Sequence, residues 1–148
     1  MLSKSLEKLY VQGLGKLQTE VESYRDEKDM WKTSAEIPNS AGNLTLHLIG
    51  NLNHFFGATI SESGYVRNRD AEFSSDNVSR AQLVEGIEGA TEVVRTALKG
   101  LTDGDLEKIF PIEFQNEAVS TEYVLTYLLG HFNYHLGQIN YHRRLLAS

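Results

Sequence analysis

Only two prolines, Pro38 and Pro111, interrupt this chain of 148 residues, so long helices can form over most of its length. Apolar residues recur at spacings of three and four in four stretches, which is the pattern of helices that bury one face. These stretches cover residues 2–27, 39–61, 76–100 and 120–144. We therefore predict an all-α fold, a four-helix bundle formed by a single domain over residues 1–148.

The ends of the predicted helices carry recognisable signals. Ser79 and Gln82 form a capping-box pattern at the start of the third helix, and Gly100 is placed to end it. Two connections are long, residues 62–75 and residues 101–119. The first is long enough to let the second and third helices run parallel, and the second is compatible with a small irregular hairpin.

Charge and composition exclude several classes of function. The net charge is −6 and the basic residues form no block, which argues against a nucleic-acid-binding protein. No apolar run approaches the roughly 18 residues that would predict a membrane span. The chain has no cysteine, which excludes a disulfide scaffold, a thiolate metal site and a cysteine nucleophile. The first residues lack the apolar segment of a signal peptide, and we expect a cytoplasmic protein.

Three histidines fall where they could hold one metal ion. His131 and His135 are four residues apart on the fourth predicted helix, so they share a face, and His47 lies on the second. All three occupy core-facing stripes, where an imidazole needs a polar partner. A shared metal would satisfy them together and leave a coordination position open, as in catalytic sites. Hydrogen-bonded core histidines are the alternative.

Other metal-site patterns are missing. The chain contains no His-Glu-x-x-His motif, no Glu-x-x-His pair and no Cys-x-x-Cys-His motif, which disfavours a zincin protease, a ferritin-like di-iron site and covalent c-type haem. His54 and His142 each lie seven residues from a proposed ligand, about 10.5 Å along a helix. We expect both to be surface or hydrogen-bonded imidazoles rather than ligands.

Several residues near the histidines admit two interpretations. Asn51 and Gln138 could orient bound water or a substrate carbonyl, or be ordinary buried amides. Gly130 and Gly137 could admit a ligand or another backbone, or permit close packing within the bundle. The charged residues within 67–73 could bind a ligand, but a solvated cluster of ion pairs is the interpretation that we favour.

The segments 47–52 and 131–139 resemble the two histidine motifs of the DinB/YfiT-like superfamily, and residues 65–73 resemble the crossover of one of its branches. The resemblance implies a four-helix bundle of up-down-down-up topology that is often dimeric. It also implies a divalent ion, nickel or zinc in several members, held by His47, His131 and His135. Some members of the superfamily are thiol-dependent transferases or isomerases, and others are described as hydrolases.

Together these features predict a divalent-metal-dependent enzyme that carries out thiol-dependent transfer or hydrolase-like chemistry on a small electrophilic substrate. A low-molecular-weight thiol is the expected co-substrate. No residue can be assigned as the general base from the sequence. The alternative is a non-catalytic bundle protein that binds a metal or a small ligand.

We also expect a homodimer. Besides its histidine-bearing stripe, the second predicted helix carries a further apolar stripe, formed by Leu46, Ile49, Phe56 and Ile60. A helix that is apolar on two sides needs two packing partners. The second partner is either another helix of the same bundle or a second subunit, and we predict that a two-fold dimer covers this stripe.

Overall fold

Helices account for most of the chain in the computed structural model, which describes residues 1–148. In chain order the elements are α1 (Leu2–Ser23), the 3₁₀ turn η1 (Glu27–Trp31), α2 (Ala41–Leu52), the π-helix η2 (Asn53–Ile60), α3 (Arg69–Ser74), α4 (Arg80–Lys99), α5 (Asp103–Glu107) and α6 (Thr121–Leu146). There are no strands, only isolated antiparallel bridges. The all-α prediction is confirmed. No helix is long and apolar enough to cross a bilayer.

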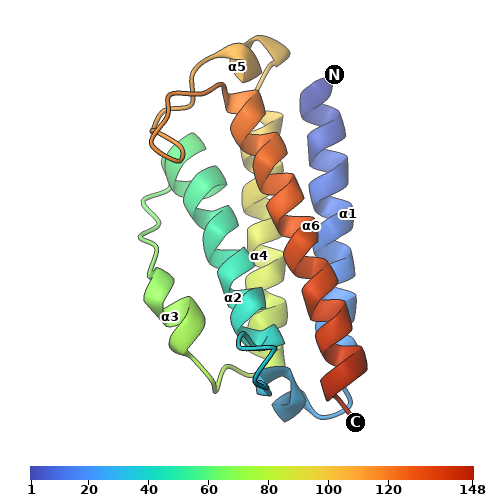
Figure 1. Ribbon diagram of the computed structural model, residues 1–148. Helices are drawn as coiled ribbons and strands as arrows, with labels where there is room; N and C mark the ends of the chain where they lie inside the picture. Colours follow the sequence, from blue (N-terminus) through green and yellow to red (C-terminus); the bar gives the residue numbers. More distant parts are fainter.

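Four long helical segments lie side by side (Figure 1). α2 continues directly into η2, and this segment runs in the same direction as α4, opposite to α1 and α6. Both α1 and α2 contact α4 and α6. The parallel course of α2 and α4 requires a connection that returns along the length of the bundle. That connection carries α3, a short helix that the sequence pattern did not predict, along the outside of α2 (Figure 1).

Serine side chains fix the start of the long helices. Ser40, Ser79 and Ser120 each accept a hydrogen bond from the backbone N–H three residues ahead. These bonds satisfy N–H groups that a helix start otherwise leaves without a partner. The capping box predicted between Ser79 and Gln82 is confirmed.

The end of the first predicted helix and the content of the second long connection differ from the predictions. The first helix ends at Ser23 rather than near residue 27, because Asp26 accepts a hydrogen bond from the Lys28 N–H and begins the separate turn η1. The connection over 101–119 contains α5 as well as the small irregular hairpin. Phe114 and Glu117 pair through two backbone hydrogen bonds of 2.9 and 3.1 Å, and the residues between them have φ of 52° and 64°. This is the backbone of a tight hairpin turn.

One apolar core runs through the bundle, and it covers the further stripe of α2. Phe56 is fully buried, while Leu46, Ile49 and Ile60 pack against the core. Gly86 of α4 permits this, because a Cβ there would lie only 2.9 Å from Ile49 Cδ1. The second partner of α2 is therefore another helix of the same chain. A second subunit is therefore not needed to cover this stripe, and the homodimer stays a prediction.

Candidate metal centre

Three imidazoles from two helices converge inside the bundle. α2 supplies His47, and successive turns of α6 supply His131 and His135. The Nε2 atoms of His47 and His131 are 3.1 Å apart. The candidate ligand nitrogens of all three residues lie within 4.8 Å of one another. The structure therefore brings together the three histidines singled out from the sequence.

A buried carboxylate holds His47. Glu72, on α3, is only 6% exposed, and its Oε1 lies 3.0 Å from His47 Nδ1. Arg67 donates from Nε and Nη2 to the two carboxylate oxygens, both at 2.9 Å. Arg67 Nη2 also lies 3.2 Å from His47 Nδ1, but the Glu72 oxygen is closer and negatively charged, so we assign the Nδ1 proton to the bond with Glu72. His47 Nε2 is then left as a lone pair directed at His131.

The position of Glu72 depends on how α3 docks against α2. The Asn43 side chain donates to the backbone carbonyls of Glu72 and Ser75, at 2.9 and 2.6 Å. Gly50 gives the carboxylate room, since a Cβ at that position would lie 2.7 Å from Glu72 Cδ and closer still to its Oε2. The Phe73 ring packs against the His47 ring with 4.9 Å between centroids.

These contacts correct one interpretation of the sequence. Residues 67–73 do not form a solvated cluster of ion pairs, because Arg67 and Glu72 are turned inward onto His47. Sequence reasoning counted Glu72 among the charged residues that could bind a ligand but did not connect it to His47, and it missed Phe73 as part of the site. The only available signal was a carboxylate within the segment that resembles the DinB-like crossover, and no spacing rule connects that carboxylate to His47.

The other two histidines differ in how they are held. His135 Nδ1 lies 2.7 Å from the Oε1 of Gln138, so the amide oxygen can accept its proton and leave Nε2 unprotonated. His131 Nδ1 is buried and has no hydrogen-bond partner. An unpaired polar atom in such a place costs free energy. His131 is thus the least satisfied of the three imidazoles.

Burial keeps two of the imidazoles neutral near pH 7. It lowers the pKa of His47, although the hydrogen bond with Glu72 opposes the shift. Burial lowers the pKa of His131 to about 4, and the neighbouring His135 and His47 add to the effect. Neutral imidazole is the form that binds a metal ion.

A cavity of about 390 Å³ adjoins the histidines on the side of η2 and the hairpin. Its wall includes His47 and His131 together with Asn51, His54 and Arg69. A second hollow, of about 620 Å³, reaches His131 and His135 from the outer face of α6. Small molecules can therefore approach the imidazoles from two sides.

The two remaining histidines lie apart from the cluster. His142 is buried, and the structure confirms it as a hydrogen-bonded imidazole: its Nδ1 lies 2.7 Å from the Tyr24 hydroxyl and its Nε2 lies 2.9 Å from the Lys32 carbonyl. Both ring nitrogens are thus occupied in holding α6 to α1 and η1. His54 is partly exposed and packs against Phe55.

The residues present fit a divalent ion. Tetrahedral zinc with bonds of about 2.0–2.1 Å to nitrogen places two ligand nitrogens about 3.3 Å apart, close to the 3.1 Å between the Nε2 atoms of His47 and His131. Metal-binding histidines usually donate their second N–H to a carboxylate or an amide oxygen. His47 and His135 have such partners in Glu72 and Gln138, whereas His131 does not.

Comparison with known proteins gives a family but no activity. The model of a family described as "Protein of unknown function (DUF1572)" matches residues 8–148 of the chain. The matched region includes all three site histidines and Glu72. No curated protein matches the chain. The function therefore has to be argued from the site.

Proposed function

The chain belongs to the DUF1572 family, and from the geometry of its three histidines we propose that it is a divalent-metal-dependent enzyme acting on a small electrophilic substrate. The observation that carries the proposal is the approach of two neutral imidazoles, His47 and His131, to 3.1 Å between Nε2 atoms, with His135 alongside. Such nitrogen pairs repel unless a proton or a cation lies between them.

Each residue of the site has a stated role in this proposal. His47, His131 and His135 would hold the ion. Glu72, fixed by Arg67, keeps His47 in the tautomer that presents its Nε2 lone pair, and Gln138 does the same for His135. When bound, a divalent ion would lower the pKa of a coordinated water or thiol and polarise the substrate.

The adjoining cavity would take the substrate. Asn51 is buried in its wall and makes no side-chain hydrogen bond within the protein, so its amide is available to orient a substrate carbonyl. The apolar rings of Phe55 and Phe114 line the same cavity and limit access of water. A small molecule fits a cavity of about 390 Å³.

The class of chemistry rests on the resemblance of the two histidine motifs to the DinB/YfiT-like superfamily. We propose the DinB-like up-down-down-up topology for this bundle, which the parallel course of α2 and α4 supports. By the same resemblance the ion is nickel or zinc, both of which suit imidazole ligands. The reaction would then be thiol-dependent transfer or hydrolysis, with a low-molecular-weight thiol as co-substrate.

Metal analysis of protein purified without an affinity tag tests the proposal. We expect about one nickel or zinc ion per chain, and we expect His135→Ala to abolish binding. His54→Ala is the matched control, because His54 lines the same cavity but lies outside the three-histidine cluster. Equal loss of metal in both variants, or none in either, would rule out the assignment.

Turnover separates an enzyme from a binding protein. The metal-loaded protein is assayed with several thiols and small electrophiles, and with ester and amide substrates. Thiol consumption that His135→Ala removes would support a transferase, and thiol-independent cleavage would support a hydrolase. Stoichiometric metal without turnover in any assay would favour the non-catalytic alternative.

A further inference from the structure

Two arginines of the crossover line the cavity beside the histidines. Arg67 and Arg69 both belong to the wall of the cavity of about 390 Å³ that His47 also lines. The Arg67 side chain is only 14% exposed, and it uses Nε and Nη2 to bind Glu72, which leaves Nη1 without a hydrogen-bond partner. Arg69 makes no ion pair and no side-chain hydrogen bond within the chain. The wall therefore carries guanidinium donors that the protein itself does not use.

An aromatic contact holds Arg69 near the candidate ligands. Its guanidinium carbon lies 5.5 Å from the centre of the Phe73 ring, which is a cation–π contact. The same ring packs against His47, with 4.9 Å between centroids. A ring contact restricts the guanidinium without using its N–H donors, so these stay available to a ligand. Phe73 thus fixes an unused cation two contacts away from His47.

The same cavity has an aromatic wall built from three elements. η2 supplies Phe55, the hairpin supplies Phe114 and α6 supplies Tyr127. The Phe114 ring lies edge-to-face with the other two, at centroid distances of 5.7 and 5.2 Å. Such a surface suits an apolar or aromatic part of a ligand. The cavity therefore combines one cationic part with one apolar part, as ligand pockets commonly do.

We propose that this cavity binds small carboxylates, with Arg69 and Nη1 of Arg67 holding the carboxylate and the aromatic wall holding the rest of the molecule. A carboxylate matches both the charge and the planar geometry of a guanidinium. It also relieves the repulsion between two cations in one wall. The inference rests on the proposed function in one respect, because that function makes the ligand a substrate. The substrate is then an electrophile that carries a carboxylate a few atoms from its reacting carbon.

One carboxylate of the protein lies in the same wall and has to be weighed against the arginines. Glu113 belongs to the hairpin and is exposed, and it pairs with neither Arg67 nor Arg69. No side-chain contact fixes it, whereas Phe73 fixes Arg69. A group that is already held in place loses less freedom when it binds a ligand. We therefore assign recognition to Arg69, and we expect Glu113→Gln to leave carboxylate binding as strong or to strengthen it.

Three matched probes test the sign of the ligand's charge and the residue that reads it. Benzoate, benzamide and benzylamine share a ring and carry an anionic, a neutral and a cationic group. In NMR titrations of metal-free protein we expect benzoate to bind about tenfold more tightly than benzamide, because its partner is charged, and benzylamine to bind least. Arg69→Gln should remove most of this preference, and Arg69→Lys should keep part of it. Without the metal, benzoate cannot be held by an ion instead.

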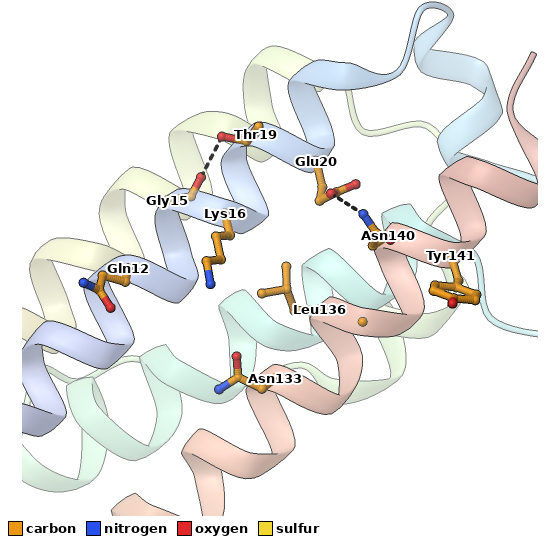
Figure 2. A pocket seen from close by; sticks show the side chains of 10 residues that line it. Gln12, Gly15, Lys16, Thr19, Glu20, Asn133, Leu136, Asn140 and Tyr141 are labelled. Carbon is orange, nitrogen blue, oxygen red and sulfur yellow. Dashed lines mark hydrogen bonds between the residues drawn. The ribbon is translucent and has the colours of Figure 1, made fainter.

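Lys16→Gln is the matched control, because it removes the same charge from a hollow that holds no histidine. Lys16 lines the groove of about 840 Å³ between α1 and α6 (Figure 2). The Glu20 carboxylate of that groove accepts a hydrogen bond of 2.7 Å from Asn140. Lys16→Gln should leave the preference for benzoate unchanged.

Four results would overturn the carboxylate site. They are failure of benzoate to bind, equal binding of benzoate and benzamide, tightest binding of benzylamine, and equal losses in Arg69→Gln and Lys16→Gln. Because these titrations need no metal, they succeed or fail independently of the metal analysis that tests the proposed function. For a carboxylate-bearing electrophile that the metal-loaded protein turns over, Arg69→Gln should raise KM about tenfold and change kcat little. A fall in kcat with KM unchanged would contradict the role of Arg69.

Discussion

Replacing Gly50 with alanine should destabilise the protein, although the same change in most helices is stabilising. The added Cβ would lie 2.7 Å from Glu72 Cδ, whereas carbon atoms in contact are about 3.5–4.0 Å apart. The methyl group therefore overlaps the carboxylate by close to 1 Å. Glu72 cannot turn aside freely, because Arg67 binds both of its oxygens and His47 binds one.

The expected magnitude follows from two opposing effects. Alanine gains about 1 kcal/mol over glycine from helix propensity. Overpacking of a buried site costs about 1–3 kcal/mol, and weakening of a hydrogen bond to a charged group costs about 1.5–3 kcal/mol more. We expect Gly50→Ala to lower the free energy of unfolding by roughly 1.5–5 kcal/mol. It should also weaken metal binding about 10–100-fold, because Glu72 no longer orients His47.

Urea denaturation, with a chelator present, measures the change in the free energy of unfolding. Calorimetric titration with nickel or zinc measures the change in metal affinity. Gly89→Ala is the matched control, since Gly89 is also helical but faces open space. It should raise the free energy of unfolding by up to about 1 kcal/mol and leave metal affinity unchanged. If Gly50→Ala were as stable as Gly89→Ala, the proposed contact between α2 and Glu72 would be refuted.

Two further predictions concern the core and the buried histidines. Phe56→Glu should lower the free energy of unfolding by about 4 kcal/mol or more, because it places an unpaired charge in the core. Circular dichroism should show a largely unfolded chain. A folded monomer would contradict the burial of Phe56. In metal-free protein, the lowered pKa values of His47, His131 and His142 mean that the unfolded chain binds more protons below about pH 6.5. The free energy of unfolding should therefore fall as the pH drops from about 6.5 towards 4, with a shallower slope in His142→Gln, and a flat profile over this range would contradict the shifts.

The crossover between α2 and α4 has two roles in this structure. Its length allows the two helices to run parallel, and its short helix α3 delivers Glu72 to His47. Asn43 fixes α3 to α2 through two backbone carbonyls. The arrangement of the bundle and the orientation of His47 thus depend on the same segment. Changes in α3 should therefore affect both stability and metal binding.

The sequence by itself determined features that depend on near neighbours in the chain. Serine caps set where α2, α4 and α6 begin, because a capping side chain reaches only two or three residues ahead. The spacing of His131 and His135 placed both on one face of α6, because helix geometry is fixed. The apolar stripes identified the buried faces of the long helices for the same reason.

Tertiary structure decided which faces meet. The sequence showed that α2 is apolar on two sides, but periodicity identifies a face and not its partner, and the partner proved to be the chain itself. Likewise, no local rule links Glu72 to His47, which lies 25 residues earlier. Their contact depends on the path of the crossover, which brings α3 against α2. It also depends on Gly50, because any side chain at that position would overlap Glu72 once α3 is in place.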